Sequence, residues 1–170
     1  MSDEMRRPPI PAPEFNINIE HSSGFSRQAS LSILGDLAAN VFPNVSTLII
    51  HIFRPMLHPV DFQFTSFIIS LASVKELHAT PYALNRLVNM PQLLQDGTSG
   101  PAAVFPQLRT LVIDFEFDQL SISRFLAWKR QIGGTAIEVL DLTNLKVNDT
   151  DVTVKAMRGF DGLKVLKGRT

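Results

Sequence analysis

Four residues that could supply acid–base or metal-binding groups stand in or directly after apolar runs of this chain. They are His51, His78, Asp114 and Asp141. Imidazole and carboxylate side chains act as general bases and as metal ligands, so these residues are the candidates for chemistry. The chain has no cysteine, which excludes a thiolate zinc site, a cysteine nucleophile and a disulfide framework. Whether the four can act together depends on the elements that position them.

Five copies of a short apolar pattern predict those elements. In each copy an aliphatic residue is followed three positions later by leucine, and the leucines recur at intervals of roughly 26 to 34 residues, as in repeats that pair one strand with one helix. The copies are Val45-x-x-Leu48, Val74-x-x-Leu77, Leu108-x-x-Leu111, Ile137-x-x-Leu140 and Leu163-x-x-Leu166. The longest interval contains residues 96–100, which we interpret as an inserted surface loop.

Further elements follow from apolar spacing. Alternation of Phe15, Ile17 and Ile19 predicts one strand before the repeats. Between strands, spacings of three and four predict helices, and a shorter helix is expected near residues 151–158. The helix faces are Leu31, Leu34, Leu37 and Ala38; Phe64, Phe67, Ile68 and Leu71; Leu84, Leu87 and Val88; and Ile122, Phe125 and Leu126 with Lys129 as a polar member. This order predicts parallel strands joined by right-handed crossovers under one helix layer.

Composition narrows the class of protein. With 170 residues, of which 45% are hydrophobic, one domain over residues 15–170 is expected after a flexible proline-rich arm at residues 1–14. Sixteen basic residues match sixteen acidic ones without a long basic run, which argues against nucleic-acid binding. No window approaches the roughly 20 apolar residues of a membrane span, and the start lacks a signal-peptide pattern. We expect an intracellular protein, cytoplasmic or nuclear, that binds no membrane.

The repeats resemble leucine-rich repeats of the ribonuclease-inhibitor-like kind, whose pattern is L-x-x-L-x-L-x-x-N or C. The matching stretches are Val45-x-x-Leu48-x-Ile50, Leu108-x-x-Leu111-x-Ile113 and Ile137-x-x-Leu140-x-Leu142. At the Asn or Cys position this chain has Phe53, Glu116 and Leu145 instead. The resemblance implies an α/β fold, a leucine-rich-repeat-like solenoid with a curved parallel sheet and one outer helix layer.

Two repeats also carry a proline that sharpens the resemblance. Phe42-Pro43-Asn44-Val45 and Phe105-Pro106-Gln107-Leu108 are similar to the irregular repeats that follow F-box domains, particularly in fungal proteins. That resemblance implies substrate recognition in a ubiquitin-ligase context. Residues 1–40 provide no recognisable F-box.

Alternation along the strands assigns fifteen residues to the face opposite the helices. They form three rows: Thr47, Glu76, Thr110, Val139 and Val165; Ile49, His78, Val112, Asp141 and Lys167; His51, Thr80, Asp114, Thr143 and Arg169. His78 and Asp141 then stand two strands apart, on the order of 10 Å, while Asp141 and Lys167 are neighbours that form a modest ion pair. No Ser, His and acid set comes together, so we predict no enzyme, no cofactor and no metal site.

The acidic stretch from Asp114 to Asp118 is the remaining candidate for a cation site. If the strand persists, its three carboxylates share one face and Phe115 and Phe117 the other. A calcium loop needs Gly where Gln119 stands and Glu where Phe125 stands. We therefore interpret the stretch as a solvated acidic rim.

The leading functional prediction is a protein-interaction module that binds a protein partner on the concave strand face. The predicted partner-binding residues are Ile49, His51, Glu76, His78, Val112, Asp114, Asp141, Thr143 and Lys167. The alternative is a structural or self-associating protein that pairs through its uncapped C-terminal edge strand.

Overall fold

The computed structural model describes residues 14–19, 27–39, 42, 44–52, 62–90, 104–133, 135–145, 157 and 160–168. Several predicted features lie outside the described residues. They are the proline-rich arm up to residue 13, the loop at 96–100, the helix at 151–158 except Met157, and Arg169.

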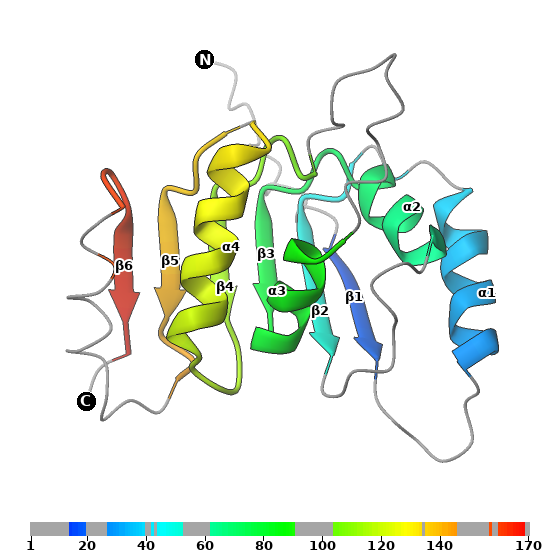
Figure 1. Cartoon of the computed structure of the whole chain (residues 1–170), viewed down its shortest axis with the longest axis horizontal. Coiled ribbons are helices and arrows are strands. Elements are labelled where there is room, and N and C mark those ends of the chain that lie inside the picture. The colour runs from blue at the N-terminus through cyan, green and yellow to red at the C-terminus, as the bar shows by residue number, and fades with distance from the viewer. Residues whose placement is uncertain are drawn as a thin grey trace, which may run out of the picture.

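The described residues form an α/β structure in which six strands make one parallel sheet in sequence order (Figure 1). The strands are β1 (Glu14–Ile19), β2 (Thr47–Ile52), β3 (Glu76–Ala79), β4 (Thr110–Ile113), β5 (Val139–Leu142) and β6 (Lys164–Lys167). The helices are α1 (Arg27–Ala38), α2 (Phe62–Ser70), α3 (Pro81–Val88) and α4 (Gln119–Gln131). The predicted order of parallel strands is therefore confirmed, including the first strand, which pairs with β2.

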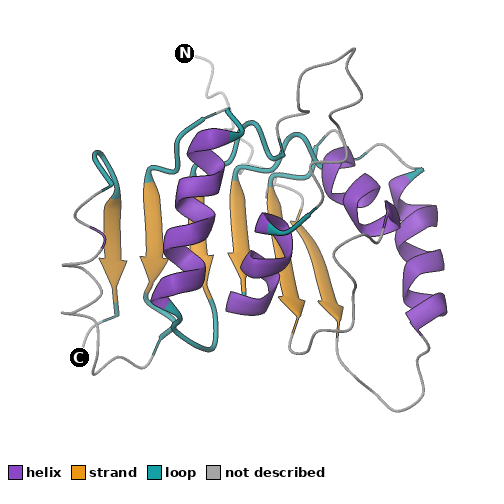
Figure 2. Ribbon diagram, viewed as in Figure 1, coloured by secondary structure: helices purple, strands orange, loops and turns teal. Residues whose placement is uncertain are grey.

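The helices cover one face of the sheet, and the core lies between the helices and that face (Figure 2). Alternate strand residues such as Leu48, Leu77 and Leu111 are fully buried there, as the repeat pattern predicts. Helix residues such as Phe67 and Phe125 belong to the same core. The neighbours of the buried strand residues consequently point to the opposite face of the sheet.

Lys129 is a charged residue that is buried on the core-facing side of helix α4. Its side chain is only 2% exposed, and its Nζ donates to the carbonyl of Gly133 at 3.2 Å. Burial removes water from the ammonium group and lowers the pKa of Lys129. Gly133, with φ of +80°, follows the C-cap residue Ile132 of α4, a position where glycine commonly ends a helix. The lysine stem thus joins the core while its charge meets the C-terminal end of the helix.

Strand β6 departs from the predicted register by one residue. Val139 is aligned with Lys164 and Asp141 with Leu166, whereas the repeat pattern aligns them with Val165 and Lys167. Lys167 is aligned with Leu142, so its predicted place beside Asp141 is wrong. A one-residue shift moves every side chain of the strand to the other face.

The cause of the shift lies in how each strand starts. Two successive N–H groups donate to one carbonyl where β3, β4 and β5 begin; for example, Arg109 and Thr110 both donate to Lys75. At β6 the carbonyl of Glu138 accepts from Lys164 alone among the described residues. Strands β3, β4 and β5 therefore each accommodate one additional residue at their start, whereas β6 does not.

Candidate functional site

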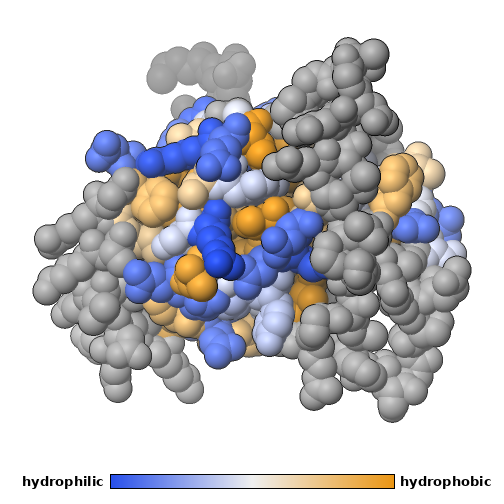
Figure 3. Space-filling model, viewed as in Figure 1, coloured by the Kyte–Doolittle hydropathy of each residue, from blue (hydrophilic) through white to orange (hydrophobic). Residues whose placement is uncertain are grey.

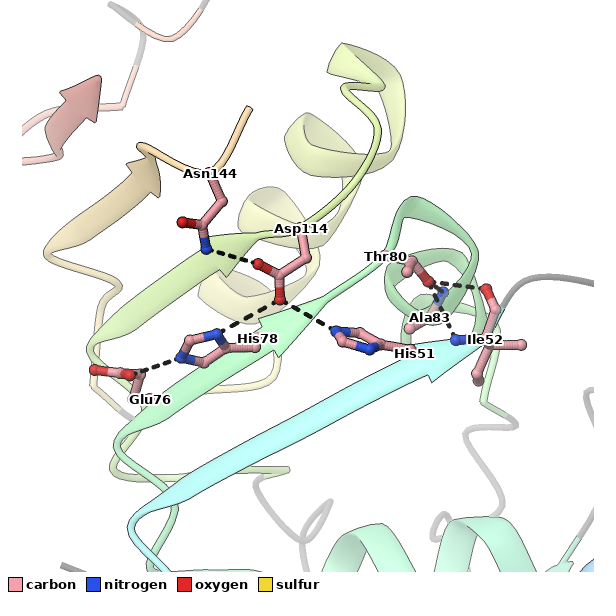
Figure 4. Close-up of polar contacts among 8 residues, drawn as sticks. All are labelled: His51, Ile52, Glu76, His78, Thr80, Ala83, Asp114 and Asn144. Carbon is pink, nitrogen blue, oxygen red and sulfur yellow. Dashed lines mark hydrogen bonds and ion pairs between the residues drawn. The ribbon is translucent and has the colours of Figure 1, made fainter. Parts of the chain in front are cut away.

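Four ionisable side chains meet on the sheet face opposite the helices. The Oδ2 atom of Asp114 lies 3.2 Å from Nε2 of His51 and 3.5 Å from Nδ1 of His78. Nε2 of His78 in turn lies 2.8 Å from Oε1 of Glu76. Figure 4 shows both imidazoles turned toward the same carboxylate. We call these residues, together with Asn144, the His–Asp cluster.

Alternation in two short strands places the imidazoles. His51 stands between the buried Ile50 and Ile52 of β2, and His78 between the buried Leu77 and Ala79 of β3. Because their neighbours fill the core, both rings point to the opposite face. The predicted face is therefore confirmed for the two histidines.

Thr80 does not join the face on which the sequence places it. It is 3% exposed and caps α3, where its Oγ1 accepts from the N–H of Ala83 at 3.3 Å. The same oxygen accepts from Ile52 N–H at 3.3 Å and donates to Ile52 O at 2.9 Å. Thr80 precedes Pro81, a pair that favours a helix start over a further strand residue. If β3 continued through Thr80, the Thr80 side chain would lie between His51 and Asp114. Because Thr80 caps α3 instead, that space is free of its side chain.

The acidic stretch also leaves the strand geometry that the sequence predicts. Strand β4 ends at Ile113, and Glu116 N–H donates to the carbonyl of Asp114 at 2.9 Å. Phe115, between them, has φ of 69°, so the three residues form a γ-turn of the rare, strained kind. The strand does not persist, so the condition for a shared face of three carboxylates is not met. Asp118 instead caps α4 by accepting from Leu120 N–H at 3.0 Å.

The turn displays Phe115 beside the cluster. Its side chain is 65% exposed, and its ring meets the ring of His51 edge to face at a centroid distance of 4.8 Å. Alternation along a continued strand would place Phe115 on the opposite face from Asp114, so the sequence misses this neighbour. A non-glycine residue at positive φ is the signal of strain, but only the structure reveals it.

Asn144 is the second residue that the sequence misses. Its Nδ2 donates to Oδ1 of Asp114 at 2.9 Å, from the turn after β5. Leu145 N–H closes that turn by donating to Leu142 O at 3.1 Å. Simple alternation assigns Asn144 to the core side, because it ignores the turn.

The other predicted partner-binding residues lie outside the cluster. Ile49 is half-buried and Val112 is 5% exposed, so Val112 offers little surface. Asp141 is half-buried and accepts from Thr143 N–H at 2.8 Å, and Thr143 itself is exposed. The predicted ion pair of Asp141 with Lys167 loses its basis in the observed register.

The cluster can donate and accept hydrogen bonds through groups whose orientation is already fixed. The carboxylates of Asp114 and Glu76 hold the imidazole rings, and the amide of Asn144 holds the carboxylate of Asp114, which reduces the side-chain entropy lost on binding. Among the residues that the structure describes, no group of three or more His, Asp or Glu side chains is arranged to hold a metal ion. The cluster is thus an oriented set of polar side chains with the exposed ring of Phe115 beside it.

Comparison of the chain with protein-family models, with curated proteins and with solved structures finds no match. None of the described helices has the length and apolar character needed to cross a membrane.

Proposed function

We propose that this protein is an interaction module of the leucine-rich-repeat-like kind that binds a protein partner on the sheet face opposite the helices. We call that surface the open face. Its described residues are Glu14, Thr47, Glu76, Thr110, Val139 and Lys164; Asn16, Ile49, His78, Val112, Asp141 and Leu166; and His51 with Asp114. The sequential order of the parallel strands, with helices α1, α2, α3 and α4 between the first five, supports the repeat interpretation.

The observation that carries the proposal is the exposed ring of Phe115 at the edge of the His–Asp cluster. Large exposed aromatic side chains surrounded by oriented polar groups are frequent anchors of protein interfaces. The left-handed backbone at Phe115 is costly for a bulky residue, and such strain gathers at functional sites. A partner that covers this ring would bury apolar surface that the free protein leaves in water.

The helix side provides a matched comparison surface. Figure 3 shows the described side chains there as mainly hydrophilic, with apolar residues in small separate patches. Tyr82, on helix α3, is an exposed aromatic residue like Phe115, with 50% of its surface exposed. Replacing Tyr82 therefore shows how the loss of an exposed aromatic ring outside the open face affects partner binding.

Quantitative affinity capture tests the proposal with Phe115→Ala and the control Tyr82→Ala. We expect a defined protein partner that the wild type and Tyr82→Ala capture equally and that Phe115→Ala loses, with circular dichroism unchanged. Equal capture by both variants, or loss with Tyr82→Ala alone, would overturn the proposal. Ubiquitin-ligase subunits in the captured set would support the role that the F-box-like resemblance implies.

The purified wild-type protein also tests the alternative function, self-association. Strand β6 stands at one edge of the described sheet, and an edge strand can pair with another chain. Sedimentation over a wide concentration range should give a constant mass if the open face serves a different protein. A mass that rises with concentration and falls back on Val165→Asp would favour pairing through β6 instead.

A further inference from the structure

We infer that the segment bound by the open face is extended and basic, with arginine side chains; this inference rests on the proposed function. Carboxylates stand at Glu14, Glu76, Asp114 and Asp141 of the open face, whereas the only Lys or Arg side chain among its described residues is Lys164. The described part of the open face is therefore negative, although the whole chain has no net charge. Charge complementarity selects a positive partner and repels acidic chains and nucleic acid.

The carboxylates are distributed across the strands. The most accessible carboxylate of the His–Asp cluster is Glu76 of β3, whose side chain is 42% exposed, and Asp141 stands on β5. Two strand spacings across the sheet and two residues along the strands separate them, on the order of 10 Å. A chain in the extended polyproline II conformation advances about 3.1 Å per residue and returns to the same face every three residues, so one that crosses the strands brings every third side chain to a carboxylate. Asp114 of the intervening strand end adds charge between the two.

Phe115 favours arginine over lysine in that segment. A guanidinium is planar, pairs with carboxylates through two N–H groups and stacks on aromatic faces. The exposed ring of Phe115 stands one residue from Asp114, so a single arginine can meet both features. A lysine ammonium would gain the charge attraction but less of the stacking.

Fluorescence anisotropy with labelled peptides tests this inference. The probes are twelve-residue peptides in which Arg, Lys or Glu occupies every third position and Gly and Ser fill the others. We expect the Arg peptide to bind more tightly than the Lys peptide, and the Glu peptide not to bind at 50 mM NaCl. The double variant Glu76→Gln/Asp141→Asn should weaken Arg-peptide binding about tenfold, and 300 mM NaCl should weaken it further.

The control Asp36→Asn removes a carboxylate from helix α1 and should leave the affinity unchanged. Equal binding of the Arg and Glu peptides, or an affinity insensitive to Glu76→Gln/Asp141→Asn, would overturn the inference. Binding that Asp36→Asn weakens equally would overturn it too, because the attraction would then be nonspecific. Capture of a partner that depends on Phe115, without any preference for basic peptides, would refute the basic segment and leave the proposed function standing.

Discussion

The imidazole of His51 on β2 lies 3.2 Å from the carboxylate of Asp114, which directly follows β4, although β3 runs between these two strands. Side chains two strands apart meet here because β3 ends at Ala79 and the next residue turns into α3. The contact joins residues 63 positions apart in the sequence. It makes the end of β3 the place where the His–Asp cluster forms.

A double-mutant cycle measures the coupling between these two residues. We expect His51→Ala and Asp114→Asn each to lower the free energy of unfolding by about 1 kcal/mol, because each leaves a partly buried polar partner less well satisfied. Urea denaturation of the singles and the double should give a coupling of about 0.5 kcal/mol or more. Additive effects would show that the contact contributes nothing. Glu116→Gln, an exposed neutralisation two residues away, should have little effect.

The positive φ of Phe115 can be tested by comparing the stabilities of two variants at this position. Asparagine tolerates the left-handed region, whereas a β-branched valine strongly disfavours it. Both lose the ring contact with His51, so that loss cancels in the comparison. Phe115→Asn should be more stable than Phe115→Val by about 1 kcal/mol in thermal unfolding. The reverse order would contradict the γ-turn.

The hydroxyl group of Thr80 caps α3 and also forms hydrogen bonds with the backbone of Ile52 in β2. Thr80→Val keeps the shape but removes the hydroxyl, and we expect it to lower the free energy of unfolding by about 2 kcal/mol. Thr80→Ser keeps the hydroxyl and should cost less than half as much. Equal losses for the two variants in urea denaturation would argue that packing of the methyl group, and not the hydrogen bonds, matters.

Two glycine-to-alanine changes should act in opposite directions. A Cβ at Gly168 would lie 2.9 Å from the carbonyl oxygen of Thr143, so Gly168→Ala must move backbone and should destabilise by about 1–3 kcal/mol. A Cβ at Gly35 in α1 would meet only Cγ of Gln63 at 3.5 Å, an ordinary contact. Gly35→Ala should stabilise by about 0.5–1 kcal/mol. Thermal unfolding of both proteins checks the two signs together.

Lys129 gives stability a dependence on pH. Because burial lowers the pKa of Lys129 from its ordinary value of 10.5, the unfolded chain holds this proton to higher pH than the folded chain. The free energy of unfolding therefore rises with pH between the folded pKa and the unfolded one, as the desolvated ammonium loses its proton. The stability of Lys129→Met relative to the wild type should fall from pH 7.5 to pH 10 in urea denaturation. A difference that does not vary with pH would contradict the burial of the charge.

Local sequence patterns predicted much of the architecture for a simple reason. Apolar periodicity reports which side chains must leave water, so Leu48, Leu77, Leu111 and Leu140 marked four strands and their buried face. The alternation also placed His51 and His78 on the opposite face. It erred by one residue at β6, because the sequence does not reveal which carbonyl accepts the N–H of Lys164.

The sequence by itself determined the order of strands and helices and the side of the sheet on which the histidines lie, because both follow from local spacing. Only the tertiary structure decided that Asp114 meets His51 and His78, that Thr80 withdraws and that Phe115 is exposed. Each of these depends on where a strand ends and how the next turn bends. The helix start at Thr80 and the turn at Phe115 are themselves local, but the contact that they permit joins residues 63 positions apart, and the spacing of apolar residues within one stretch does not report such a contact.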